Sequence, residues 1–135
     1  MTNSIRADKY VTDTMGFVLR MEQRKLSRQV KQIFDDVEVG KTTVYIPAIV
    51  FAEILYLSEK QRIGISIDDV TAYIERYPNY IEYPLSFSVI QASARITDIR
   101  ELHDRLIAGT ALFLDMVLLT NDPVIQASTF VNTCW

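Results

Sequence analysis

The sequence predicts an α/β fold whose strands form a mostly parallel central sheet. Short β-branched or apolar runs alternate with longer helical patterns along the chain, which is the order typical of parallel sheets. Residues 116–119 are apolar throughout, as expected for a strand that helices cover on both faces. They follow a helical pattern at 101–114, so the stretch 101–122 is interpreted as a helix leading into a buried strand.

Five segments have the composition of strands, and these are residues 9–14, 42–46, 80–83, 116–119 and 129–135. Helices are expected at residues 15–39 with a break near Ser27, and at 48–60, 67–77, 86–95 and 101–114. Ser66 and Asp69 resemble a capping box, and Pro47 and Pro123 stand where a first helical turn tolerates proline.

Length and composition indicate one ordinary globular domain covering residues 1–135. Apolar residues make up 49% of the 135 residues and charged residues 23%, which argues against disorder. The net charge of −3 gives no general basic surface. A nucleic-acid partner would therefore have to be held by a local basic patch or through a metal ion.

Cysteine content and hydropathy predict a soluble cytoplasmic protein. Cys134 is the single cysteine, so no internal disulfide can form, which suits a reducing compartment. The first residues are polar and lack the apolar core of a signal peptide. Glu53 and Asp115 interrupt the longest apolar stretches, well short of the ~20 residues that a membrane span needs.

Four acidic residues are expected at one edge of the sheet. Asp13 lies at the end of the first strand, Asp122 lies just past the strand at 116–119, and Asp104 lies early in a helix on the same face as apolar positions. Helix N-termini and the carboxyl ends of parallel strands lie at the same edge, where open parallel sheets place their sites. The helix at 48–60 is apolar on nearly all sides, so it is expected to be buried, and Glu53 has no cation beside it there.

Each of these acids also has a structural explanation. Asp13 and Asp122 both stand where a helix N-cap is expected, and Glu53 could be an edge residue that reaches water. Four carboxylates together would repel one another strongly without a counter-charge. Oxygen-only ligands suit Mg²⁺ or Mn²⁺, and such ions support displacement at phosphorus. The sequence therefore predicts metal-dependent phosphodiester or phosphate chemistry.

At these positions the chain resembles the PIN-domain family, in particular the VapC-type toxin ribonucleases of toxin–antitoxin pairs. The matching segments are residues 10–14, 46–54, 102–111 and 119–122, in this order and over nearly the whole chain. The resemblance implies a three-layer α/β/α fold with a mostly parallel sheet of about five strands. Gly109 and Asp115 depart from the residues that are frequent at their positions in the family.

The resemblance also implies roles for individual residues. It assigns catalysis and binding of Mg²⁺ or Mn²⁺ to Asp13, Glu53, Asp104 and Asp122. Supporting roles fall to Thr14, Thr120 and Asn121. The implied activity is endonucleolytic hydrolysis of RNA by a homodimer that an antitoxin protein silences, with no membrane partner.

Two further features stay open from sequence. Arg20, Arg24 and Arg28 recur every four residues and could contact RNA phosphates, although a solvated helix face is the simpler interpretation. His103 precedes Asp104 and is expected to point away from it, exposed or against a loop.

The sequence also bears on other functions. An aspartyl phosphohydrolase or a phosphoacceptor domain would need a late lysine, and none follows Lys60. A PIN-like scaffold that binds RNA or protein without cutting would be expected to lose a metal-binding acid, and all four are present. A PIN nuclease of RNA processing or decay, without an antitoxin, is the remaining alternative.

Overall fold

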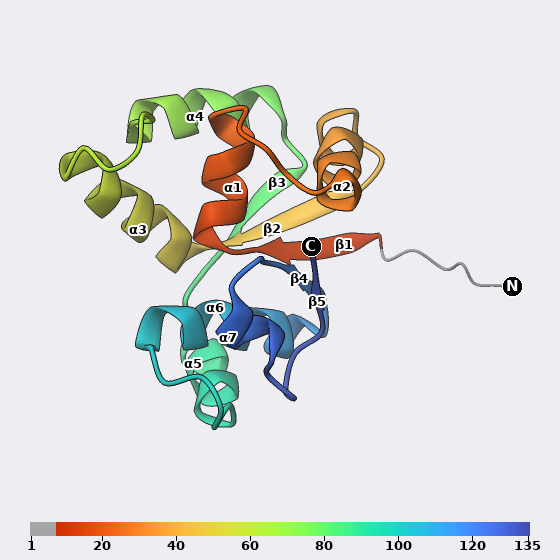
Figure 1. Cartoon of the computed structure of the whole chain (residues 1–135), viewed down its shortest axis with the longest axis vertical. Coiled ribbons are helices and arrows are strands. Elements are labelled where there is room, and N and C mark those ends of the chain that lie inside the picture. Colours follow the sequence, from red (N-terminus) through yellow and green to blue (C-terminus); the bar gives the residue numbers. More distant parts are fainter. Residues whose placement is uncertain (1–7) are drawn as a thin grey trace, which may run out of the picture.

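A parallel five-stranded sheet is the centre of the computed structural model, which describes residues 8–135 (Figure 1). The strands lie in the order β3-β2-β1-β4-β5, and all four neighbouring pairs are parallel. Their bounds are β1 Lys9–Thr12, β2 Thr43–Pro47, β3 Tyr80–Tyr83, β4 Val117–Leu119 and β5 Thr133–Cys134. The expected α/β fold with about five strands is confirmed, and the last strand is shorter than the expected 129–135. The polar start of the chain, on which the expectation about a signal peptide depends, lies outside the described residues.

Seven helices connect these strands in residues 8–135. They are α1 Thr14–Met21, α2 Arg28–Glu38, α3 Ala48–Glu59, α4 Ile67–Arg76, α5 Phe87–Ala94, α6 Leu102–Leu114 and α7 Pro123–Gln126. In Figure 1, α1, α2 and α4 lie on one side of the sheet, and α5, α6 and α7 lie on the other. None of the helices within this part of the chain is long and apolar enough to cross a membrane.

Local sequence signals explain most helix ends. Ser27 caps α2 and accounts for the break expected within 15–39, and Ser66 and Asp69 form the predicted capping box of α4. Ser86 caps α5 by accepting a hydrogen bond from the backbone N–H of Val89. At the end of α6, Asp115 adopts φ 55°, the left-handed conformation that often ends a helix.

The core lies on both faces of the sheet. Fully buried side chains from β1, β2 and β4 meet helical ones from α1, α2 and α6 there, including Val11, Ile46, Leu118, Phe17, Phe34 and Ile107. The packing of α6 against α5 is especially close, because a Cβ on Gly109 would lie 1.8 Å from Ser93 Oγ. A side chain at Gly109 would therefore displace α6, and Asp104 with it.

The expectation that α3 is buried on all sides is wrong. Only Val50 and Ile54 of α3 are buried, whereas Leu55 and Tyr56 are 46% and 52% exposed. The single chain offers α3 a packing surface on one side only, so its other apolar face reaches the surface. A helix that is apolar on all sides is therefore not always a core helix. One of its faces can lack a packing partner within the chain.

Candidate active site

The candidate site is a cavity of about 330 Å³ at the carboxyl ends of β1 and β4. The strand order places these two strands side by side, although β4 follows β1 by more than a hundred residues. The backbone N–H of Asp13 donates to the carbonyl of Leu119 at 3.1 Å, which fixes the chain after β1 to the end of β4. Parallel sheets commonly bind ligands at such a point, where neighbouring strands send their chains to opposite faces.

All four acids expected at this edge line the cavity, and they come from four separate segments. The acidic residues are Asp13, Glu53, Asp104 and Asp122, and the other lining residues are Thr14, Met15, Leu57, Ile107, Asn121 and Pro123. None of these is a lysine or an arginine. The arginines Arg20, Arg24 and Arg28 do not line it.

Asp13 is the most deeply buried of the four acids, and each of its carboxylate oxygens accepts a hydrogen bond. It is 7% exposed and caps α1, accepting a hydrogen bond at 2.7 Å from the backbone N–H of Gly16. Its other oxygen accepts from Thr120 Oγ1 at 2.6 Å. A Cβ at Gly16 would lie 2.8 Å from Thr12 Oγ1 and 3.0 Å from Asp13 Oδ1, so glycine leaves room for these two side-chain oxygens.

Asp122 is connected to the same hydroxyl. Its backbone N–H donates to Thr120 Oγ1 at 3.1 Å, and its carboxylate caps α7 by accepting from the N–H groups of Val124 and Ile125. Asp13 and Asp122 therefore have the capping role that the sequence offered as their structural explanation, and they line the cavity as well. Thr120 links the two.

Glu53 and Asp104 approach from the two helices that flank the cavity. Thr14 Oγ1 donates to Glu53 Oε1, which links α3 to the start of α1. Glu101 caps α6 by accepting from the N–H of Asp104 at 2.8 Å and from that of His103 at 3.2 Å. A residue of α1 thus positions the carboxylate of Glu53, and the cap of α6 positions the backbone of Asp104.

Two of these contacts were missed from the sequence. Glutamate is an unusual N-cap residue, so the sequence does not predict Glu101 as the cap of α6. Half of the His103 side chain is exposed, as expected, and its Nδ1 also lies 3.3 Å from Glu53 Oε2, a contact that the sequence does not predict. Glu53 therefore has a partner, which the sequence of α3 alone could not reveal. The sequence feature that could have indicated this cap is the position of an acceptor side chain, Glu101, three residues before Asp104.

The electrostatics of the cavity disfavour ionisation of two acids. Burial raises the pKa of Asp13 to about 6, and the charges of Asp122 and Glu53 add to this effect against the hydrogen bonds from Thr120 and Gly16. The pKa of Asp104 is also raised to about 6, by burial and then by Glu101, Asp122, Glu53 and Asp13. The cavity lining has no lysine or arginine, so a bound cation would offset the repulsion among these carboxylates.

A divalent cation fits the chemistry of these donors. Carboxylate oxygens are the ligands that Mg²⁺ and Mn²⁺ prefer. Within residues 8–135, however, no group of three or more acidic, histidine or cysteine side chains is already arranged to hold a metal. Mg²⁺ keeps several of its waters and binds through only one or two carboxylates directly. Because the acids are not close enough for three of them to bind one ion directly, they suit an ion that contacts some of them through water.

Comparison with known protein families identifies the fold. The model of the PIN domain matches residues 10–129, which is most of the chain. The chain belongs to the PIN-domain family. Among curated proteins, none matches this sequence.

Chains with a similar fold occur in solved structures of toxin–antitoxin complexes. A chain of VapBC2 from Rickettsia felis, bound to promoter DNA, has a TM-score of 0.71 at 17% identity, covering 94% of this chain and 98% of that one. A chain of DNA-bound VapBC from Salmonella typhimurium has 0.69 at 14%, covering 93% and 96%. A toxin–antitoxin complex from Klebsiella pneumoniae has 0.65 at 16%, with the same coverage. At these identities the likeness supports the shared fold.

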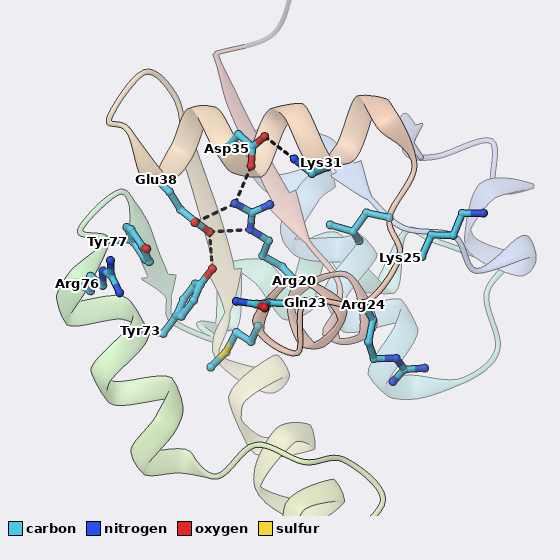
Figure 2. A pocket seen from close by; sticks show the side chains of 12 residues that line it. Arg20, Gln23, Arg24, Lys25, Lys31, Asp35, Glu38, Tyr73, Arg76 and Tyr77 are labelled. Carbon is cyan, nitrogen blue, oxygen red and sulfur yellow. Dashed lines mark hydrogen bonds and ion pairs between the residues drawn. The ribbon is translucent and has the colours of Figure 1, made fainter.

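Arg20 and Arg24 of the predicted stripe line a second cavity of about 560 Å³, shown in Figure 2, whereas Arg28 does not line it. Arg20 donates to both carboxylate oxygens of Glu38 at 2.9 Å and to Asp35 at 2.8 Å. The guanidinium of Arg20 is thus held inside the protein, 16% exposed. Arg24 points away from this group in Figure 2, and Arg28 is exposed at the start of α2.

Proposed function

We propose that this PIN domain is a metal-dependent endoribonuclease that hydrolyses RNA phosphodiester bonds, and that it acts as the toxin of a type II toxin–antitoxin pair. One observation carries the proposal: four carboxylates from four chain segments line one cavity with no lysine or arginine among its lining residues. Family membership supports the same chemistry, because PIN domains are nucleases.

In this proposal Asp13, Glu53, Asp104 and Asp122 hold Mg²⁺ or Mn²⁺. When bound, the ion would supply an activated water and neutralise charge that develops on the phosphate. Asp13 and Glu53 are oriented for this task by the hydroxyls of Thr120 and Thr14.

The remaining polar groups position the site and its substrate. Glu101 holds the first turn of α6 by its backbone N–H groups, which sets where the carboxylate of Asp104 enters the cavity. Asn121 lies in the cavity wall between Thr120 and Asp122, where its amide could donate to a phosphate oxygen. With no positively charged side chain in the wall, a phosphate would be attracted through the metal rather than through the protein.

The related structures and the exposed apolar surface support two protein partners for this chain. The similar VapBC and toxin–antitoxin chains were solved as complexes, which supports an antitoxin as the partner of this chain. Phe87 and Ile90 of α5 are 73% and 43% exposed. Such a surface supports association into a homodimer, because monomeric proteins rarely leave large apolar side chains grouped in water.

Cleavage of RNA by the purified chain tests the activity. We expect RNA to be cut in Mg²⁺ or Mn²⁺ but not in EDTA, with cleavage lost in Asp13→Asn and Asp104→Asn. Asp115→Asn is the matched control: it removes an exposed carboxylate beyond the other end of α6, at a left-handed position that asparagine tolerates. RNA binding without cleavage by the wild type would favour the scaffold alternative.

Growth tests the toxin role separately. We expect overexpression to slow growth, and Asp104→Asn to relieve it at equal protein level. Equal toxicity of both proteins would exclude nuclease action as the cause. A nuclease that cuts RNA but neither slows growth nor pairs with the product of a neighbouring short gene would instead act in RNA processing or decay.

A further inference from the structure

A third cavity, of about 330 Å³, lies beside the acidic one and has a different lining. Its residues are Ile49, Ala52, Glu53, Tyr56, Leu57 and His103. Five of the six belong to α3, and His103 closes the cavity from the first turn of α6. Glu53 supplies the single carboxylate, so the lining is otherwise apolar or aromatic.

The two cavities share a wall. Glu53 and Leu57 line both of them, so the apolar cavity begins where the acidic one ends. His103 stands at this boundary, with its Nδ1 3.3 Å from Glu53 Oε2. A molecule held by the four acids would therefore have its next group within reach of the apolar cavity.

The apolar cavity offers two planar rings that are accessible from solvent. Tyr56 is 52% exposed, and half of the His103 side chain is exposed. Lys60 Nζ lies 5.7 Å from the centre of the Tyr56 ring, which places a cation next to this ring. Aromatic side chains bind bases of single-stranded nucleic acids by stacking, and a nearby cation suits the adjoining phosphate.

We propose that this cavity is a nucleobase subsite, in which Tyr56 and His103 bind the base that flanks the phosphate held at the four acids. The subsite rests on the proposed ribonuclease function and names part of its substrate: an unpaired base of single-stranded RNA. A base inside a duplex is stacked on its neighbours and could not enter.

The neighbouring charges favour a base over other occupants. A phosphate would be repelled by Glu53, and an acidic peptide by Glu53 together with the rest of the acid cavity. A base is flat and uncharged, and it arrives on the same strand as the phosphate that the metal holds. Its own backbone would continue toward Lys60.

Short RNAs that carry one abasic nucleotide test the subsite. Binding is measured with the Asp13→Asn protein, which leaves the RNA intact, and cleavage with the protein that has all four acids. We expect an abasic nucleotide next to the scissile phosphate to weaken binding and slow cleavage on the order of 10-fold. In Tyr56→Ala this abasic penalty should disappear, because the base no longer has its stacking partner.

Two variants make the test specific. Tyr56→Phe keeps the ring and should keep the abasic penalty. Leu55→Ala removes an exposed apolar side chain of the same helix outside the cavity, and it should behave as the parent protein. Circular dichroism would check that each variant is folded.

The outcomes separate the subsite from the nuclease. An unchanged abasic penalty in Tyr56→Ala, with normal cleavage, overturns the subsite and leaves the nuclease. Dissociation of a dimer by Tyr56→Ala, without any base effect, overturns it by showing that a second copy fills the cavity. Absence of cleavage on every RNA refutes the proposed function, whereas base-dependent binding lost in Tyr56→Ala would still support the subsite.

Discussion

Two groups of charged residues in this domain differ in how their charges are balanced. In the acid cavity four carboxylates meet without a cationic side chain among the residues that line it. Around Arg20, by contrast, Glu38 and Asp35 bind the guanidinium, and Glu38 also accepts from the hydroxyl of Tyr73 (Figure 2). The hydroxyl of Tyr80 donates to Glu38 as well. Both groups connect several elements of the fold. The balanced group has the properties of a structural centre, and the unbalanced one has those of a binding site.

The pKa values differ in the same way. Although burial opposes ionisation, hydrogen bonds from Arg20, Tyr73 and Tyr80 lower the pKa of Glu38. In the acid cavity burial and neighbouring carboxylates raise the pKa values of Asp13 and Asp104. A folded protein keeps an unbalanced cluster of this kind at a cost to its stability.

The largest stability effect is expected in the balanced group. Glu38→Gln removes the charge that Arg20 and two tyrosine hydroxyls share, while the side chain keeps its shape. Breaking a buried ion pair from one side costs about 3 kcal/mol of unfolding free energy, and denaturant titration would measure it. The matched control Glu75→Gln, an exposed residue of α4, should change stability by less than about 0.5 kcal/mol.

The activity of this variant sharpens the comparison. RNA cleavage per folded molecule should be unchanged in Glu38→Gln, because Glu38 is remote from the acid cavity. Loss of cleavage at temperatures where the variant is still folded would show that the two groups are coupled.

The next effect is expected from metal binding. A divalent ion at the acid cavity should stabilise the protein by about 2.7 kcal/mol at a concentration one hundred times its Kd. Thermal unfolding in Mg²⁺ or Mn²⁺, compared with EDTA, measures this. The rise in Tm should be lost in Asp104→Asn and kept in Asp115→Asn. An equal rise in all three proteins would place the ion elsewhere.

How far the sequence could predict these two groups depends on where their contacts come from. The alternation of strands and helices fixes where every strand ends, so it predicts the sheet edge at which the four acids lie. These are Asp13, Glu53, Asp104 and Asp122. The contacts of Glu53 with Thr14 and His103 join segments 39 and 50 residues away. No periodicity within a helix reports on such pairs.

The Arg20 group shows the same limit. The spacing of four residues predicts one helical stripe, but α1 ends at Met21, Arg24 lies in the loop after it and Arg28 begins α2. Spacing also could not show that Arg20 faces Glu38. The exposed face of α3 shows a second limit. Hydrophobicity predicts that a surface will be covered, and it does not distinguish the chain's own core from a partner.

A smaller effect should appear as a dependence of stability on pH in the metal-free protein. Burial raises the pKa of Asp13 from its ordinary value of 3.8 to about 6 in the folded protein, so between these pH values the folded state binds more protons than the unfolded one. Stability should therefore fall as the pH rises from 4 to 6, by about 1–3 kcal/mol. Asp104 contributes in the same direction.

Asp13→Asn provides the check on this slope. It should reduce the fall in stability, since the ionising group is gone, and it should be more stable than the wild type at pH 7.5 in EDTA. Denaturant titrations at pH 4 and pH 7.5 would measure both. A wild-type protein whose stability rises over this range would show that another group dominates.

The smallest effect is expected from Arg24, which separates the two interpretations of the arginine stripe. Its ion pair with Glu22 at 3.1 Å is exposed on the arginine side, and exposed pairs contribute less than about 1 kcal/mol. Arg24→Gln should therefore leave the unfolding free energy nearly unchanged. If Arg24 contacts an RNA phosphate, the same change must raise KM and lower the salt dependence of RNA binding by about one counterion. A solvated face predicts no change in either quantity. Because Arg24 lies beyond the C-terminal end of α1, whereas Asp13 caps its other end, the unchanged result is expected here.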